Sequence, residues 1–306
     1  MGPLPGRVPI AAVTAAGPRP LAARQIPPEV RRRRFLASVA NHAVAIALGL
    51  AFVVPFAFMV LTSLMTKQQA LSANLWPQPF RPSNYGDVFG LFPVLRYAAN
   101  TLLYAGLTTI GVVLSSIPVA YALSRMWWRG RQASFLLVIS TMMLPAQVTI
   151  VPLFVIFTRL HWIGSLKPLI VPAFFGDAFS IFLLRQFFLT IPQEMSDAAR
   201  VDGAGEFQIM TRIIMPLAKP GIAAVALFQF LFAWNDFFNP LLYTNQQSQT
   251  FAVALSQLTE NVAVHFGVQW NVVMAASVLF TLPVIVLFFF AQRVFIEGVT
   301  LTGVKG

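Results

Sequence analysis

The stretch FLASVANHAVAIALGLAFVVPFAFMVL, residues 35–61, decides the fold class of this chain. It contains no Asp, Glu, Lys or Arg, and a helix of about 20 apolar residues is long enough to cross the core of a bilayer. The stretch therefore predicts a transmembrane helix. The composition agrees: 57% of the 306 residues are hydrophobic and only 10% are charged, whereas about a quarter of a soluble domain is charged.

Further apolar runs of spanning length follow along the chain. They cover residues 97–123, 134–157, 168–189, 217–243 and 271–292. The run at 168–189 is the weakest, because it contains Pro172, Gly176 and Asp177. Together with 35–61, these runs predict an all-α polytopic membrane protein with six transmembrane helices.

The basic residues predict the orientation of these helices. If the N-terminus is cytoplasmic, 16 of the 21 Lys and Arg residues fall in cytoplasmic segments. Cytoplasmic loops of membrane proteins collect Lys and Arg, so both termini are expected in the cytoplasm. We expect the protein in a bacterial inner membrane.

The basic N-terminal segment has two interpretations. RRRRFLA, residues 31–37, resembles a twin-arginine export signal, but it also suits a cytoplasmic anchor for the first span. The apolar region of a signal peptide has about 7–15 residues, which is shorter than the run here, and this favours the anchor. Residues 1–34 are therefore expected to be a disordered basic tail, followed by one transmembrane domain over 35–306.

The residue types exclude several kinds of chemistry. The chain has no cysteine, and His42, His161 and His265 are far apart, so no metal site is expected. The net charge of +11 is explained by cytoplasmic loops, without nucleic acid as a partner. No G-x-x-x-x-G-K-[ST] loop occurs, and GAGEF at 203–207 lacks its lysine. We predict no catalytic residues and no cofactor bound by this chain.

A polar stretch, SDAARVDGAGEFQIMTRIIMPLAKP at 196–220, interrupts the apolar pattern. Pro192 can begin a helix over QEMSDAARVD, where Glu194 suits the positive end of the helix dipole. Gly203 is a residue type that ends helices in the left-handed conformation. A second helical run is expected from about Glu206, and IIMP should lead into the fifth span.

This polar stretch could be an ordinary amphipathic loop or a docking element. It is longer than a connection between adjacent spans requires, and Ala198 and Ala199 would let another surface approach closely. We therefore predict a short helix along the membrane surface that docks a cytoplasmic partner.

The same stretch resembles the cytoplasmic signature of binding-protein-dependent ABC importer permeases. That signature reads Glu-Ala-Ala, three residues, Gly, nine residues, then Ile-x-Leu-Pro. The matching positions are Asp197, Ala198, Ala199, Gly203, Ile213, Met215 and Pro216. Asp197 replaces Glu and Met215 replaces Leu, both conservatively. In that family the short helix is the coupling helix in a cleft of the ATPase subunit, which implies a coupling region at about 190–219, with Glu194 and Asp202 included.

Three other stretches resemble the carbohydrate importers within this family. They are FLLRQFFLTIPQEMSDAARVDGA (182–204), FAWNDFFNPLL (232–242) and QRVFIEGVTLTGVKG (292–306). The last is similar to the tail of the maltose-type inner-membrane permease, which reaches between the ATPase subunits. The resemblance thus implies ATPase contacts for Gly303, Val304, Lys305 and Gly306.

The resemblance also implies a set of partners. They are a second homologous permease, two ATPase subunits that hold ATP and Mg, and an extracytoplasmic sugar-binding protein. Two alternatives remain: an ABC importer permease for a non-sugar solute, and an ion-driven secondary transporter. The second would need intramembrane carboxylates and inverted repeats, yet no internal repeat is visible and the stretch at 196–220 would be unexplained.

Two acidic residues fall within the predicted spans. Ionisable groups there are costly and usually face a cavity or a partner. Asp236, with Trp234 and Asn235 beside it, could line the translocation pathway or could make a structural hydrogen bond between helices. Asp177 could also touch the pathway, or it could mark a break near the outer surface.

Overall fold

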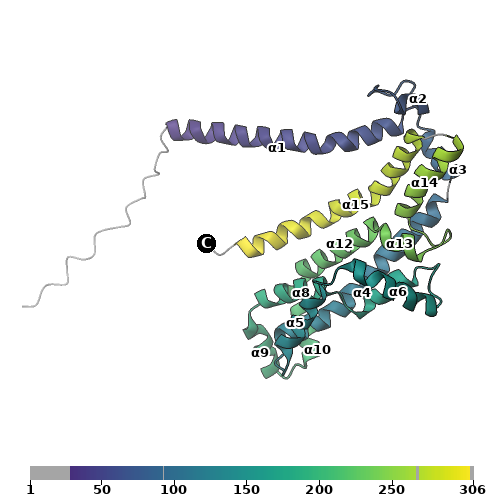
Figure 1. Ribbon diagram of the computed structural model, residues 1–306. Coiled ribbons are helices and arrows are strands. Elements are labelled where there is room, and N and C mark those ends of the chain that lie inside the picture. The colour runs from purple at the N-terminus through teal and green to yellow at the C-terminus, as the bar shows by residue number, and fades with distance from the viewer. Residues whose placement is uncertain (1–27, 92, 267–268, 304–306) are drawn as a thin grey trace, which may run out of the picture. The chain divides into compact units, whose positions relative to one another are not determined.

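The computed structural model describes residues 28–91, 93–266 and 269–303, and every regular element in these ranges is a helix (Figure 1). The chain divides into two packing units, Met1–Phe56 and Ala57–Gly306. The long helices are α1 (Pro28–Ser63), α4 (Val94–Arg125), α12 (Lys219–Asn235) and α15 (Trp270–Gly303).

The shorter elements connect or extend these helices. On the way to α12 they are α2 (Lys67–Ala70), α3 (Asn84–Leu91), α5 (Arg131–Thr141), α6 (Ala146–Arg159), α7 (Lys167–Ile170), the 3₁₀ helix η2 (Val171–Phe175), α8 (Ala178–Thr190), α9 (Gln193–Val201), α10 (Glu206–Ile209), the π-helix η3 (Met210–Ile214) and α11 (Met215–Leu217). After α12 come α13 (Phe238–Tyr243) and α14 (Phe251–Phe266).

The all-α membrane fold predicted from the apolar runs is confirmed. Among the described residues, four helical segments are long and apolar enough to cross a membrane: Arg32–Ser63, Val94–Arg125, Lys167–Thr190 and Trp270–Phe290. They coincide with four of the predicted runs. The number of six spans is consistent with this structure and stays a prediction.

Three predicted spans are not continuous helices. The run at 168–189 is divided at Gly176 and Asp177, between η2 and α8, which agrees with the interpretation of Asp177 as a break. The run at 134–157 is divided into α5 and α6, because Pro145 disfavours a helical conformation of the residue before it. The run at 217–243 is divided at Asp236, between α12 and α13. Its N-terminal end also bends: the segments Glu206–Leu217 and Lys219–Asn235 meet at 79°.

Helix α4 lies at the centre of the second unit and packs against α8, η2 and α12. Small residues allow the close approach. A Cβ atom on Gly111 of α4 would lie only 2.8 Å from the Phe174 ring, and one on Gly221 of α12 would overlap Phe187 of α8. Close backbone packing of this kind is the usual way in which membrane helices associate.

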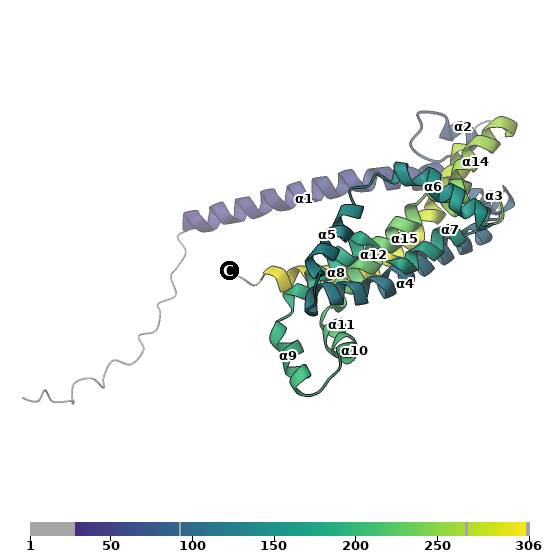
Figure 2. The same cartoon turned by 60° about the horizontal axis from the view of Figure 1, so that its bottom comes forward.

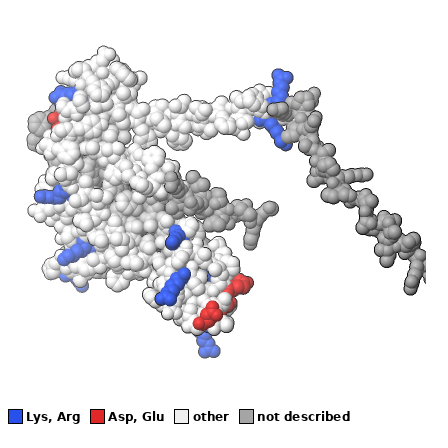
Figure 3. Space-filling view, turned by 180° about the vertical axis from the view of Figure 1, so that it is seen from behind, with Lys and Arg blue, Asp and Glu red and all other residues white. Residues whose placement is uncertain are grey.

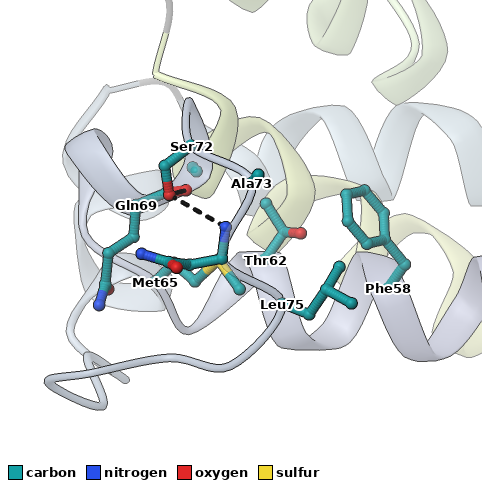
Figure 4. Close-up of a pocket in the computed structure, with 9 residues that line it drawn as sticks. Phe58, Thr62, Met65, Gln69, Ser72, Ala73 and Leu75 are labelled. Carbon is teal, nitrogen blue, oxygen red and sulfur yellow. Dashed lines mark hydrogen bonds between the residues drawn. The ribbon is translucent and has the colours of Figure 1, made fainter.

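At the opposite end of the unit from α9 and α10, a buried amide fixes the end of α1. Asn84 donates to the carbonyl oxygens of Ser63 and Met65, both at 2.8 Å, and accepts from the side chain of Asn271 at 3.0 Å. This arrangement ties the last turn of α1 and α3 to the start of α15. A shallow hollow of about 190 Å³ lies beside it, where Phe58 and Thr62 of α1 face Leu75 of the following loop (Figure 4).

Candidate functional site

The polar stretch forms the helix–turn–helix that its sequence predicts. α9 covers Gln193–Val201 directly after Pro192, and α10 begins at Glu206. Gly203 between them has a φ of +83°, the left-handed conformation expected of a helix-ending glycine. Figure 2 shows α9 and α10 together at one end of the α4–α8–α12 bundle, where they form a projecting tip.

The inner face of this tip packs on its own chain. Ser196 and Ala199 are buried, and Ala199 lies in a cluster with Ile117 of α4, Phe188 of α8 and Ile209 of α10. Ala198 and Asp197, by contrast, are exposed. The two alanines of the signature therefore face different surroundings: one holds α9 against the bundle and the other is open to a partner.

Arg200 joins the two helices of the tip through ion pairs. Its Nε lies 2.7 Å from Glu206 Oε1, and its Nη1 lies 2.7 Å from Asp197 Oδ1. The hydrogen bonds from Arg200 hold the pKa of the Glu206 carboxyl below its usual range, and those from Arg200 to both acids raise the pKa of the guanidinium. Glu206 also accepts a hydrogen bond of 2.5 Å from the Tyr121 hydroxyl of α4.

A buried guanidinium fixes this tip to two helices of the bundle. Arg125, the last residue of α4, is 2% exposed. It donates to the carbonyl oxygens of Phe188, Ile191 (2.5 Å) and Pro192 (3.4 Å), and to Oε1 of Gln193 (2.9 Å). The Arg125 carbonyl in turn accepts from Arg200 at 3.3 Å. The end of α4, the end of α8 and the start of α9 are thus joined through one side chain.

Sequence reasoning did not identify Tyr121 and Arg125 as members of this site. Their acceptors lie more than 60 positions away in the chain. The available signal was a basic residue placed directly at the end of an apolar run, which suggests carbonyl acceptors nearby.

Replacing Tyr121 with Phe tests the bond between α4 and the tip, because it removes one hydroxyl and leaves the ring. We expect the free energy of unfolding to fall by only about 1 kcal/mol, because Glu206 is part-exposed and solvent screens the interaction. Thermal unfolding of the purified protein measures it, with Tyr243→Phe in α13 as the matched control. An equal effect of both changes would contradict the assignment.

The second half of the signature lies in the segment before the bend. Ile213 belongs to the π-helix η3, and Met215 and Pro216 begin α11. Pro216 was expected to lead directly into the fifth span; instead the 79° bend at Ala218 separates it from α12. Pro220 explains the new start, because proline is favoured in the first turn of a helix.

The outer surface of the tip combines acids with exposed apolar side chains. Figure 3 shows acidic side chains gathered at this end, and Glu194, Asp197 and Asp202 are exposed there. Val201 is 88% exposed and Phe207 is 74% exposed. Exposed apolar side chains in an otherwise polar segment are typical of surfaces that contact another protein or a membrane.

The predicted pathway residues of α12 are engaged in local contacts. Asp236 accepts from the Tyr104 hydroxyl at 2.7 Å and from Asn239 Nδ2 at 3.1 Å. Trp234 is buried and stacks on Phe230 and Phe280. Asn235 is exposed and donates to the carbonyl of Leu231. The contacts of Asp236 favour the structural interpretation, a bond between α4 and the α12–α13 junction.

Asp177 has an equally local role, and the tail is only partly described. The Asp177 carboxylate accepts from the Ser180 backbone N–H at 2.7 Å and so caps α8. Gly303 ends α15, whereas Val304, Lys305 and Gly306 lie outside the described residues. Within the described part of the chain, no three His, Asp or Glu side chains form a group that could hold a metal.

These features, a bundle of apolar helices with a polar helix–turn–helix at one end, define a membrane transport subunit. A family model described as "Binding-protein-dependent transport system inner membrane component" matches residues 111–300. The chain belongs to this family. It is a multi-pass inner-membrane protein and a transport subunit, not itself an enzyme.

Two relatives match most of the chain. The arabinooligosaccharides transport system permease protein AraQ of Bacillus subtilis (strain 168) is 33% identical over 265 residues, which are 85% of this chain and 92% of AraQ. The inner membrane ABC transporter permease protein YcjP of Escherichia coli (strain K12) is 32% identical over 82% of this chain and 91% of its own length.

A solved structure shares the fold. It is a chain of a bacterial ABC transporter involved in the import of the acidic polysaccharide alginate, with a TM-score of 0.74, 24% identity, and coverage of 86% of this chain and 97% of that chain. The resemblance seen in residues 197–216 is thus confirmed at the level of family and fold.

Proposed function

We propose that the chain is the membrane permease subunit of an ATP-driven importer for a sugar or oligosaccharide. The supporting observation for the substrate is the relative AraQ, whose name specifies arabinooligosaccharides. A non-sugar solute is the second candidate, because the sn-glycerol-3-phosphate transport system permease protein UgpE of Yersinia pestis (strain Antiqua) is 36% identical over 65% of this chain and 70% of UgpE. The family membership leaves no reason for the ion-driven alternative.

The tip formed by α9 and α10 is the coupling element, and it docks on an ATPase subunit. The observation that carries this assignment is the exposure of Val201 and Phe207 beside Asp197 and Ala198 on one projecting element. The buried core of a protein interface is apolar, with aromatic anchors in pockets of the partner. ATP and Mg are held by the ATPase subunits, and this chain binds no cofactor.

Closure of the ATPase subunits moves the tip, and Arg125 passes this movement to α4 and α8. The hydrogen bonds of Arg125 and Arg200 link α9 to the ends of α4 and α8. The path into α12 runs instead through the π-helix and the 79° bend. The movement of the tip is therefore transmitted to the bundle mainly through α4, which contacts α8, η2 and α12.

The remaining partners are a second permease subunit and an extracytoplasmic binding protein that delivers the sugar. The tail residues Gly303–Gly306 contact the ATPase subunits. Trp234 and Asn235 border the translocation pathway, while Asp236 and Asp177 hold its walls in place.

The experiment is a mild affinity purification of the tagged chain from its own membrane, followed by mass spectrometry. We expect an ATPase with a phosphate-binding loop and a second apolar permease to be recovered. The binding protein encoded or purified with them is then tested for thermal stabilisation by arabinooligosaccharides and by sn-glycerol-3-phosphate. Recovery of the chain without an ATPase would contradict the proposal. Stabilisation of the binding protein by sn-glycerol-3-phosphate alone would favour the non-sugar solute as the substrate.

The absence of cysteine makes the orientation directly measurable. One variant has a single cysteine in place of Val201, and a second variant has a single cysteine in place of the exposed Leu75. The two variants report the two ends of the bundle. In right-side-out vesicles, a membrane-impermeant maleimide should label position 75 and spare position 201. The reverse pattern would place both termini outside the cytoplasm.

Replacing Phe207 with Ala tests the docking surface. A buried aromatic anchor contributes about 2 kcal/mol, so we expect affinity for the ATPase subunit to fall about 30-fold without loss of the fold. Binding of the purified ATPase to the permease in detergent measures it. Phe80→Ala is the matched control, because Phe80 is 63% exposed and lies between the first two predicted spans, in a segment expected outside the cytoplasm. Equal affinity of the two variants would exclude Phe207 from the interface.

A further inference from the structure

A second group of basic residues lies beside the coupling element, where α4, α5 and α8 meet. Arg131 is the first residue of α5, and Arg185 lies in the last turns of α8. The Arg185 guanidinium lies over the ring of Phe135, which is one helical turn from Arg131 on the same face of α5. Arg129 adds a third cation in the exposed loop between α4 and α5. We call Arg129, Arg131 and Arg185, together with Trp127, the basic–aromatic patch.

Aromatic rings hold the two helical arginines in place. The Arg185 guanidinium carbon lies 3.8 Å from the centre of the Phe135 ring, and that of Arg131 lies 4.8 Å from the Trp127 ring. Each arginine also donates one hydrogen bond of 3.2 Å to a main-chain carbonyl, of Leu123 and Met126 respectively. These contacts use part of each guanidinium and leave several of its donors for a ligand.

The patch has no negative charge of its own. In the part of the chain that the structure describes, both ion pairs belong to Arg200, so Arg131 and Arg185 have no carboxylate partner. Two neighbouring cations without a counter-charge repel each other, and the repulsion grows near an apolar medium. An anion is therefore the ligand that the patch favours.

The surroundings of the patch are those of the edge of a bilayer. Trp127 is 85% exposed, and tryptophan is enriched where membrane and water meet. On the neighbouring face of α5, Leu136 and Leu137 are 58% and 69% exposed, as residues in contact with acyl chains would be. Basic pockets between transmembrane helices on the cytoplasmic side bind anionic lipid head groups.

We propose that the basic–aromatic patch binds the head group of an anionic phospholipid of the cytoplasmic leaflet. The phosphate lies between Arg131 and Arg185, Trp127 lies at the level of the glycerol backbone, and the acyl chains run along the exposed leucines of α5. The site rests on the orientation proposed above and is independent of which solute is carried. The bound lipid anchors the first turn of α5 beside α8, next to the helices that transmit the movement of the tip.

The test is native mass spectrometry of the complete transporter, as purified from membranes, in micelles that contain phosphatidylglycerol or phosphatidylcholine. The test variant carries Arg131→Gln and Arg185→Gln. The control variant carries Arg159→Gln and Lys167→Gln. These changes remove the same charge at the end of α6 and the start of α7, in the segment between the third and fourth predicted spans. Each arginine near an anionic head group contributes about fivefold in affinity, so we expect about 30-fold weaker binding of phosphatidylglycerol to the test variant. Its binding of phosphatidylcholine should not change.

Three results would overturn the proposal. They are equal retention of both lipids by the unaltered protein, unchanged retention of phosphatidylglycerol by the test variant, and an equal loss in the control variant. A protein subunit that covers the patch would give the first of these results. Should the double variant not assemble, Arg131→Gln alone is measured, with an expected loss of about fivefold. The labelling of positions 75 and 201 separately reports whether the assumed orientation is correct.

Discussion

Arg125→Leu is expected to destabilise the folded protein by at least about 3 kcal/mol. The guanidinium is buried and serves the carbonyl groups of Phe188, Ile191 and Pro192. A leucine would leave these acceptors buried without a donor, and it would detach α9 from the end of α4. The measurement is the midpoint of thermal unfolding in detergent, together with ATP hydrolysis by the assembled transporter.

Two further variants make the result specific. Arg125→Lys keeps the charge but has fewer donors in a less suitable geometry, so we expect about half of the loss. Arg129→Leu removes an exposed arginine of the same loop and should change stability by less than about 0.5 kcal/mol. If Arg125→Leu were as mild as Arg129→Leu, Arg125 would not hold the coupling element.

Gly203→Val is the second change with a large expected effect, and it acts on coupling. Gly203 has a φ of +83°, and a β-branched residue in that conformation costs about 1–3 kcal/mol. No atom lies within 4 Å of the position of an added Cβ, so the cost comes from the backbone alone. We expect the turn between α9 and α10 to shift, and uptake per ATP hydrolysed to fall at least about tenfold.

Two matched variants separate the backbone effect from the added side chain. Gly203→Asn should retain most of the coupling, because asparagine tolerates the left-handed conformation. Gly205→Ala adds a methyl group two residues away, where φ is −72° and the space around the Cβ is also open. It should behave as the unaltered protein. Normal uptake per ATP hydrolysed by Gly203→Val would contradict the view that this turn transmits the movement of the ATPase subunits.

Local signals predicted much of this structure. Long apolar runs without charge became helices, because a membrane leaves no other partner for their backbone groups. Pro192, Gly203 and Glu206 predicted the beginning, turn and continuation of the tip within a residue or two. These predictions succeeded because helix ends are determined by residues that lie next to them in the chain.

Composition alone did not locate every interruption within the apolar runs. The segments 134–157 and 217–243 have the composition of single spans, yet Pro145 and Asp236 break them. The Asp236 carboxylate at one of these breaks accepts a hydrogen bond from Tyr104, which lies on another helix. Composition over a window of about 20 residues does not register one backbone break or one distant hydroxyl group.

The network at the tip could not be predicted from the sequence for a related reason. Arg125 is paired with the main chain of residues 188–192, and Tyr121 is paired with Glu206. No periodicity links residues so far apart, and a carbonyl acceptor leaves no mark in the residue type that carries it. What the sequence offered was the position of Arg125 at the end of an apolar run.

The main-chain nature of these acceptors has a consequence for how the permease can change over evolutionary time. Because Phe188, Ile191 and Pro192 contribute carbonyl oxygens, substitutions at these positions leave the hydrogen-bond acceptors in place. The buried Phe188 ring must still pack against Ala199, but the acceptors themselves do not depend on which side chain each residue carries. Among these main-chain hydrogen bonds, position 125 must keep its guanidinium, whereas the acceptors set no requirement on the residue types that provide them.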